Sequence, residues 1–122
     1  MPDNIRKGKA AEVAAGNYLR KLGYKILEKN FRTKLGEIDI IAGDGETLVF
    51  VEVKSRNTLG FGLPQEAVGS RKIRKITMTA TAYIKMNKIK DCDMRFDVVC
   101  VMPQGSVEHI KSAFFTDGGY RF

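Results

Sequence analysis

Residues 36–54, GEIDIIAGDGETLVFVEVK, decide the fold, because they have the pattern of two strands joined by a tight turn. Both halves are apolar and rich in β-branched residues. The dipeptide Asp44-Gly45 between them readily takes the positive φ angles of a hairpin turn. A two-residue loop at Asp44-Gly45, or a four-residue loop over 43–46, predicts that Glu37 faces Glu52 and that Asp39 faces Phe50.

Side-chain alternation places the charged residues of this hairpin on one face of the sheet. Successive side chains of a strand point to opposite faces, so one face collects four charged and two apolar residues. These are Glu37, Ile41, Asp39, Phe50, Glu52 and Lys54. The other face is predicted to be entirely apolar, with Ile38, Ile40, Val49, Val51 and Val53.

Three carboxylates on one patch require nearby positive charge. Two like charges about 5 Å apart repel by roughly 3 kcal/mol at an effective dielectric constant near 20. Lys54 supplies one positive charge, and a hard divalent cation would supply the rest. Carboxylate oxygens favour Mg²⁺ or Mn²⁺, so we expect the carboxylates of Asp39 and Glu52 to lie within about 6 Å of each other.

The alternative is a solvated sheet face on which cross-strand ion pairs balance the carboxylates. The positive charges that would balance Glu37 and Glu52 are those of Lys34, Lys54 and Arg56. Ile41 and Phe50 argue against it, because apolar neighbours on the same face indicate that this face is at least partly covered. Unpaired carboxylates are costly in such a place.

The length and composition predict one domain over residues 1–122. The chain has 43% hydrophobic residues, enough for a substantial core. We expect a cytoplasmic protein without membrane insertion, because no long apolar run or signal segment is present. Cys92 and Cys100 are predicted to be reduced thiols, and the single histidine, His109, argues against a zinc site.

The net charge of +7 is unevenly distributed. Residues 70–90 hold seven basic residues and no acidic residue, and residues 1–35 hold nine basic residues against three acidic ones. A basic surface around an acidic cluster is suited to binding nucleic acid. The alternative explanations of the positive charge are solubility and binding to a membrane surface. The basic residues expected to contact phosphate are Arg71, Lys72, Arg74 and Lys75.

The remaining pattern predicts an α/β domain in the order αβββαβ with an added edge strand. We expect helices over 5–22 and 65–86, the latter with a basic outer face. Strands are predicted over 24–29, 95–102 and 107–114, and loops over 30–34 and 57–64. The strand over 95–102 follows a helix and should pair in parallel through a right-handed crossover. Glu12 lies at the margin of the first helix's apolar stripe.

A glutamate on a helix, then Asp39, then Glu52-Val53-Lys54 across a hairpin resembles the PD-(D/E)xK nuclease superfamily. Residues 7–12, 38–43 and 51–54 are similar to the corresponding segments of archaeal Holliday junction resolvases. Residues 36–39, 49–56, 61–62 and 95–98 resemble the bacterial YraN-like family over nearly the whole chain. The chain departs from the superfamily pattern at Ile38, where a proline usually precedes the aspartate.

The resemblance implies a restriction-endonuclease-like fold, in which helices flank a mixed central sheet. It also implies hydrolysis of phosphodiester bonds in DNA, including branched DNA, with Mg²⁺ or Mn²⁺ as the cofactor. It implies metal ligation by Asp39, Glu52 and the Val53 carbonyl, and a water-activating role for Lys54. Glu12 would act through a water or a second metal. Glu37 has either a supporting role at the site or an ion pair with Lys34 or Lys54.

The rival interpretation is a noncatalytic nucleic-acid-binding or scaffold protein that retains the fold. The sequence does not decide whether the nucleic acid is DNA or RNA, or whether the substrate is branched or linear. It also leaves open whether activity requires a partner protein and whether the protein is a monomer or a homodimer.

Overall fold

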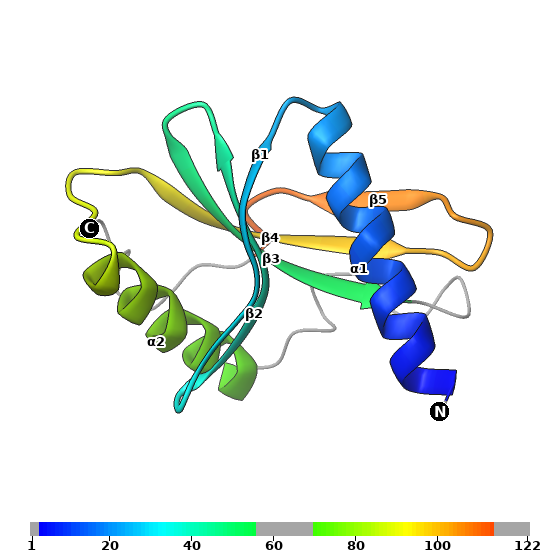
Figure 1. The fold of residues 1–122 in the computed structure, drawn as a ribbon, viewed down its shortest axis with the longest axis horizontal. Helices are drawn as coiled ribbons and strands as arrows, with labels where there is room; N and C mark the ends of the chain where they lie inside the picture. Colours follow the sequence, from blue (N-terminus) through cyan, green and yellow to red (C-terminus); the bar gives the residue numbers. More distant parts are fainter. Residues whose placement is uncertain (1–2, 56–69, 114–122) are drawn as a thin grey trace.

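The computed structural model describes residues 3–55 and 70–113. The described elements are α1 (Asp3–Lys21), β1 (Lys25–Thr33), β2 (Gly36–Asp44), β3 (Thr47–Ser55), α2 (Ser70–Met86), β4 (Met94–Val101) and β5 (Val107–Ile110) (Figure 1). The strands form one sheet in the order β1-β2-β3-β4-β5. Only β3 and β4 pair in parallel. The predicted α/β fold and element order are confirmed, and the sheet is consistent with a restriction-endonuclease-like fold.

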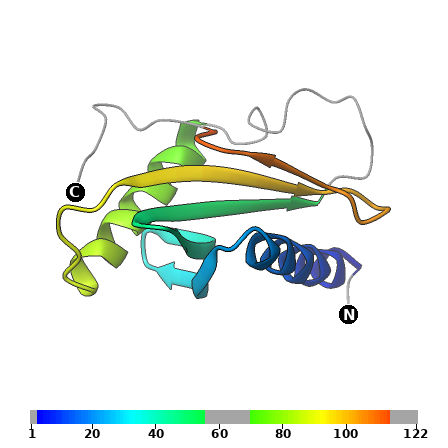
Figure 2. The same cartoon turned by 90° about the horizontal axis from the view of Figure 1, so that it is seen from above.

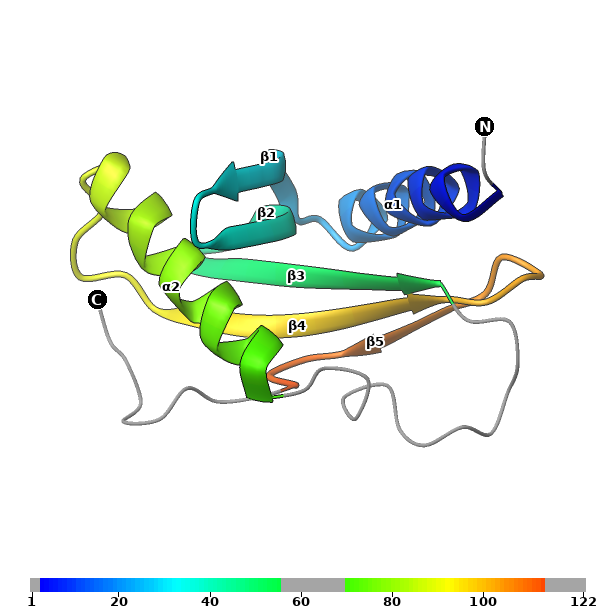
Figure 3. The same cartoon turned by 90° about the horizontal axis from the view of Figure 1, so that it is seen from below.

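Two hydrophobic clusters hold the helices against the sheet. In one, Ala15 and Leu19 of α1 pack with Ile40 and Val51. In the other, α2 packs its buried residues against Ile41, Phe50 and Phe96, among others. Ile41 and Phe50 therefore lie on a covered face, as predicted. Figures 2 and 3 show β3 and β4 side by side, with α2 near one end of these strands and α1 near the other.

The hairpin turn lies one residue later than predicted. Gly45 and Glu46 form it, with Gly45 at a φ of 60°, and Asp44 pairs with Thr47 inside the ladder. Asp44 stays in the strand, where its carboxylate lies 3.0 Å from the Arg95 guanidinium. The predicted pairing of Asp39 with Phe50 is therefore wrong, because Phe50 pairs with Ile41.

The predicted pairing of Glu37 with Glu52 fails for the same reason, since the register is shifted by two residues. Because side chains alternate with a period of two, a two-residue shift leaves each on its predicted face. The prediction that the charged residues share one face is unaffected.

Ile38 is an exception to this alternation. It packs in the α2-side cluster with Ile41 and Phe50 rather than with Ile40 and Val51, so the predicted face of Ile38 is wrong. The recorded β2–β3 pairing begins at Ile40 and Val51, and Ile38 lies before it. β2 is therefore irregular between Ile38 and Ile40, which pack in different clusters although they are two residues apart.

The element boundaries differ from the predictions in three places. β1 continues to Thr33 through the expected loop 30–34, with a bulge between Ile26 and Glu28. The first helix, predicted over 5–22, ends at Lys21, and Leu22 is 50% exposed beyond it. The edge strand, predicted over 107–114, ends at Ile110, so its predicted length is wrong. The predicted loop 57–64 and the start of the second helix at 65–69 lie outside the described residues.

α1 ends shortly before Gly23, which has a φ of 95°, and the Tyr24 amide donates a hydrogen bond to the Leu19 carbonyl. No helix in the described part of the chain is long and apolar enough to cross a membrane.

Candidate functional site

A cleft of about 460 Å³ lies between the strands β2 and β3 and the helix α2. Its strand side carries Glu37, Asp39 and Glu52. Its helix side carries Arg71, Lys72, Lys75 and Ile76, and Gly36 completes the lining. Three of the four basic residues predicted to contact phosphate therefore line the cleft that holds the carboxylates. Arg74 is exposed on the same helix but does not line this cleft.

Gly36 allows the helix to approach the strand closely. A Cβ atom at Gly36 would lie 3.0 Å from Thr79 Oγ1 and 3.3 Å from the Lys75 Cβ atom. Thr79 is itself fixed by the hydrogen bond that its hydroxyl donates to the Lys75 carbonyl. Any larger residue at position 36 would push α2 outward and widen the cleft.

Asp39 is held between Glu52 and the backbone of Val53. The Val53 amide donates a hydrogen bond to Asp39 Oδ2 at 2.8 Å. The pKa of Asp39 is raised to about 7, chiefly by burial and by the charge of Glu52, and the Val53 amide lowers it only in part. Asp39 and Glu52 both line the strand side of the cleft, near enough for their charges to interact. Their separation of about 6 Å stays a prediction.

Glu52 is the most enclosed carboxylate of the cleft, with a side chain 6% exposed. Two ammonium groups approach the same oxygen, Oε1. Lys72 Nζ lies 2.9 Å away and Lys54 Nζ lies 3.8 Å away. Lys54 therefore lies beside the carboxylates as predicted, whereas Lys72 pairs with Glu52 instead of projecting freely towards a ligand.

The two lysines respond differently to this crowding. Burial lowers the pKa of Lys54, and the neighbouring Lys72 lowers it further, outweighing the charge of Glu52. Burial also lowers the pKa of Lys72, but its hydrogen bond to Glu52 and the charge of that carboxylate leave the pKa of Lys72 raised. Without a bound cation, Lys72 is therefore the closer cationic partner of Glu52.

Glu12 and Glu37 meet at the edge of the cleft through Asn30. With the Asn30 amide oriented so that its nitrogen faces the carboxylates, it donates to Glu12 Oε1 at 2.8 Å and to Glu37 Oε1 at 3.3 Å. The charge of Glu12 also contributes to the raised pKa of Asp39, which places Glu12 in the surroundings of the carboxylate pair. The ion-pair partner of Glu37 is Arg32, at 3.2 Å, and not the predicted Lys34 or Lys54.

Asn30 is a residue that the sequence reasoning missed. Its φ of 51° lies in the left-handed region, which asparagine tolerates better than most residues. The local sequence pattern around Asn30 predicted only a loop. The link between Glu12 and Glu37 depends on α1, β1 and β2 coming together.

The donor set suits a hard cation that retains several waters. Within residues 3–55 and 70–113, no group of three or more His, Cys, Asp or Glu side chains is arranged to hold a metal ion. Mg²⁺, however, is commonly bound by only one or two carboxylates together with waters and substrate phosphates. Asp39 and Glu52 provide two carboxylates on the strand side of one cleft. The Val53 carbonyl points to the same side of β3 as its amide, which faces Asp39.

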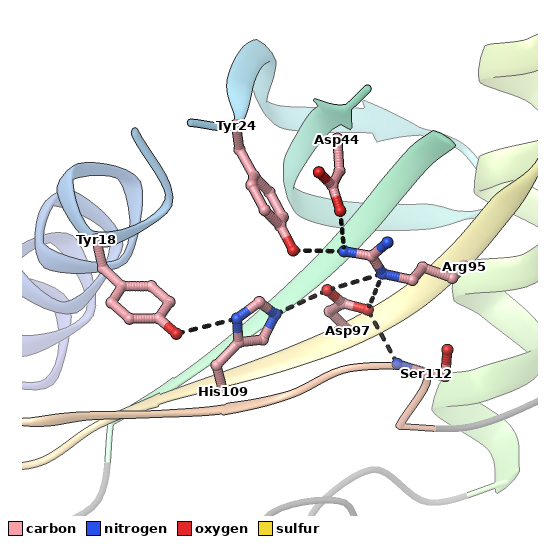
Figure 4. A network of polar contacts seen from close by, with 7 residues as sticks. All are labelled: Tyr18, Tyr24, Asp44, Arg95, Asp97, His109 and Ser112. Carbon is pink, nitrogen blue, oxygen red and sulfur yellow. Dashed lines mark hydrogen bonds and ion pairs between the residues drawn. The ribbon is translucent and has the colours of Figure 1, made fainter. Parts of the chain in front are cut away.

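A second buried polar cluster joins β4 to β5 and α1 (Figure 4). Asp97 has no exposed area and accepts hydrogen bonds from Arg95 Nε, His109 Nε2 and the Ser112 amide. Burial alone would raise the pKa of Asp97, but these hydrogen bonds and the charge of Arg95 lower it. His109 Nδ1 in turn lies 3.1 Å from the Tyr18 hydroxyl. All these groups are occupied with one another, which is the behaviour of a structural cluster.

Related proteins match the chain over most of its length. Residues 11–101 match the sequence profile described as "Uncharacterised protein family UPF0102". A UPF0102 protein of Persephonella marina is 47% identical over 111 residues, covering 91% of this chain and 95% of that protein. A UPF0102 protein of Syntrophus aciditrophicus is 49% identical over 117 residues, covering 93% and 92%. The chain belongs to the UPF0102 family.

Proposed function

We propose that this chain is a Mg²⁺- or Mn²⁺-dependent endonuclease that hydrolyses phosphodiester bonds in DNA. One observation carries the proposal: Asp39 and Glu52 line the same cleft, with Lys54 beside Glu52 and a basic helix wall opposite. A nucleic acid backbone needs cationic groups for its phosphates, and phosphodiester hydrolysis needs charge stabilisation at one phosphorus. The cleft offers both within one space.

Asp39, Glu52 and the Val53 carbonyl would hold the cation. A bound Mg²⁺ supplies Lewis acidity at the phosphate and lowers the pKa of a coordinated water. Lys54 would orient the attacking water and stabilise the charge that develops on the phosphate oxygens. Glu12 would reach the site through a water, and Asn30 would keep Glu12 and Glu37 in position.

The basic wall would place the backbone of the substrate. Arg71 and Lys75 line the cleft from α2, and Arg74 extends the positive surface outside it. Contacts of this kind hold phosphates without reading bases. The proposal therefore favours a substrate chosen by shape, and branched DNA is the first substrate to test.

One observation favours the rival function, a noncatalytic nucleic-acid-binding protein. Lys54 and Lys72 both approach Glu52, so this carboxylate is already neutralised within the protein. In a binding protein these ion pairs would persist, and no cation would enter.

The test compares wild type with Asp39→Ala, Lys54→Ala and the control Glu46→Ala, which changes an exposed carboxylate in the hairpin turn. Each protein is incubated with linear, flapped and four-way-junction DNA, and with RNA of matching sequence, in Mg²⁺ and in Mn²⁺. We expect cleavage by wild type and Glu46→Ala, and a loss of several orders of magnitude in the two cleft variants. Wild-type protein that binds these substrates, takes up no metal and cuts none of them would support the rival function.

A further inference from the structure

Lys72 occupies a position that its sequence neighbours do not share. It belongs to a run of basic residues on α2, yet its ammonium contacts the buried carboxylate of Glu52 at 2.9 Å. For Lys75, which lines the same cleft, no ion pair with a carboxylate is recorded among the described residues. Lys72 is therefore distinguished by the carboxylate that it neutralises.

A cation bound by Glu52 would compete with this ion pair. Lys54 and Lys72 approach the same oxygen of Glu52, and a divalent cation on this carboxylate would add two further positive charges there. One of the ammonium groups has to leave if the cation is to bind well. Both lysines have flexible stems, so their surroundings decide which one leaves.

The surroundings favour the departure of Lys72. The Lys54 side chain is 25% exposed and extends from β3 only two residues from Glu52. The Lys72 side chain is 44% exposed and comes from α2, across the cleft. Its ammonium can turn into the open cleft, towards the position where a phosphate would meet Arg71 and Lys75.

We propose that Lys72 is a built-in counter-ion of Glu52, which leaves the carboxylate when a divalent cation binds there and then contacts substrate phosphate. The inference rests on the proposed function, because it assumes a cation at Asp39 and Glu52. It adds that cation binding and nucleic-acid binding assist each other through one side chain. A phosphate that attracts Lys72 frees Glu52 for the cation, and a cation on Glu52 frees Lys72 for the phosphate.

The test measures Mn²⁺ affinity in the full chain, by calorimetry and by electron paramagnetic resonance of free Mn²⁺. The variants are Lys72→Met, Lys72→Arg and the matched control Lys75→Met, which removes a charge from the same cleft wall. Without nucleic acid, we expect Lys72→Met to bind Mn²⁺ at least tenfold more tightly than wild type. Lys75→Met should change the affinity by less than about threefold, because it removes only a more distant charge. Lys72→Arg keeps the positive charge and should stay near wild type.

The second measurement repeats the titration with a saturating four-way junction that carries phosphorothioate linkages to resist cleavage. The junction should increase the Mn²⁺ affinity of wild type and Lys75→Met by at least fivefold, and that of Lys72→Met by less than twofold. Circular dichroism verifies the fold of each variant.

The outcomes separate this inference from the proposed activity. Equal effects of Lys72→Met and Lys75→Met on Mn²⁺ affinity would overturn the inference and leave the nuclease proposal intact. The expected pattern without DNA cleavage would support the inference and overturn the nuclease proposal. Absence of Mn²⁺ binding in every variant would overturn both.

Discussion

Replacing Asp97 by asparagine should destabilise the protein more than any change in the exposed ion pairs. Asp97 has no exposed area, and its two oxygens accept hydrogen bonds from Arg95, His109 and the Ser112 amide. An asparagine of the same shape keeps one acceptor oxygen and turns an NH₂ group towards donors. It also leaves the half-buried Arg95 without its closest buried counter-charge.

The structure sets the magnitude of this effect. Removing one partner of a buried ion pair costs about 3 to 5 kcal/mol. Arg95 keeps its contact with Asp44, at 3.0 Å, so we expect the lower part of this range, about 3 kcal/mol. A domain of this size loses about 4 °C in Tm per kcal/mol, which predicts a decrease of about 12 °C.

The matched control is Asp44→Asn, on the other side of the same guanidinium. The Asp44 side chain is 38% exposed, whereas Asp97 has no exposed area, so solvent screens the Asp44 ion pair with Arg95 more. We expect a loss of no more than about 1 kcal/mol for this variant. Urea unfolding followed by circular dichroism, in the absence of divalent metal, gives the free energy of unfolding for each protein. A value for Asp97→Asn equal to that of Asp44→Asn would refute the reasoning.

The same residue predicts a pH dependence of stability. The pKa of Asp97 is lowered from its ordinary value of 3.8, so the folded protein favours the ionised form. Its contribution is therefore fully present above pH 4 and is lost as the pH falls through the lower folded pKa. Wild type should lose stability below pH 4 more steeply than Asp97→Asn in acid titrations of the unfolding free energy. Parallel curves for the two proteins would contradict this assignment.

Three further predictions concern the cleft and its edges. Replacing Arg71, Arg74 and Lys75 by glutamate should weaken DNA binding for all sequences alike and reduce the salt dependence of binding, as measured by fluorescence anisotropy. An unchanged affinity for duplex, junction and single-stranded DNA would show that this helix face only contacts solvent. Gly36→Ala should lower the free energy of unfolding, measured in urea, by about 1 to 3 kcal/mol, because the new Cβ atom would crowd Thr79. An unchanged urea midpoint of unfolding would contradict the close approach of α2. Asn30→Gly keeps the left-handed backbone but removes the amide that bridges Glu12 and Glu37, so the Mn²⁺ affinity measured by calorimetry should fall several-fold while thermal stability changes little. An unchanged Mn²⁺ affinity would exclude this bridging role.

The sequence by itself determined which face of the hairpin strands and of α2 turns inward, except at Ile38. The period-two pattern placed Asp39, Glu52 and Lys54 on one face, and this survived an error of two residues in the hairpin register. The basic face predicted for the second helix is exposed, and Ile76 and Tyr83 are among the buried residues of α2. Periodicity is a local property of the chain, so these predictions needed no knowledge of distant contacts.

Only the tertiary structure decided the partners of these residues. The turn lies at Gly45 and Glu46, while Asp44 stays in the strand and pairs with Arg95, a residue of the distant β4. Lys72 pairs with Glu52 because α2 packs against β2, the strand beside β3. Asp97 was part of a recognised motif, but its contact with His109 depends on β5 pairing beside β4. These contacts join segments far apart in sequence, and their formation depends on packing of the whole sheet, which no local pattern encodes.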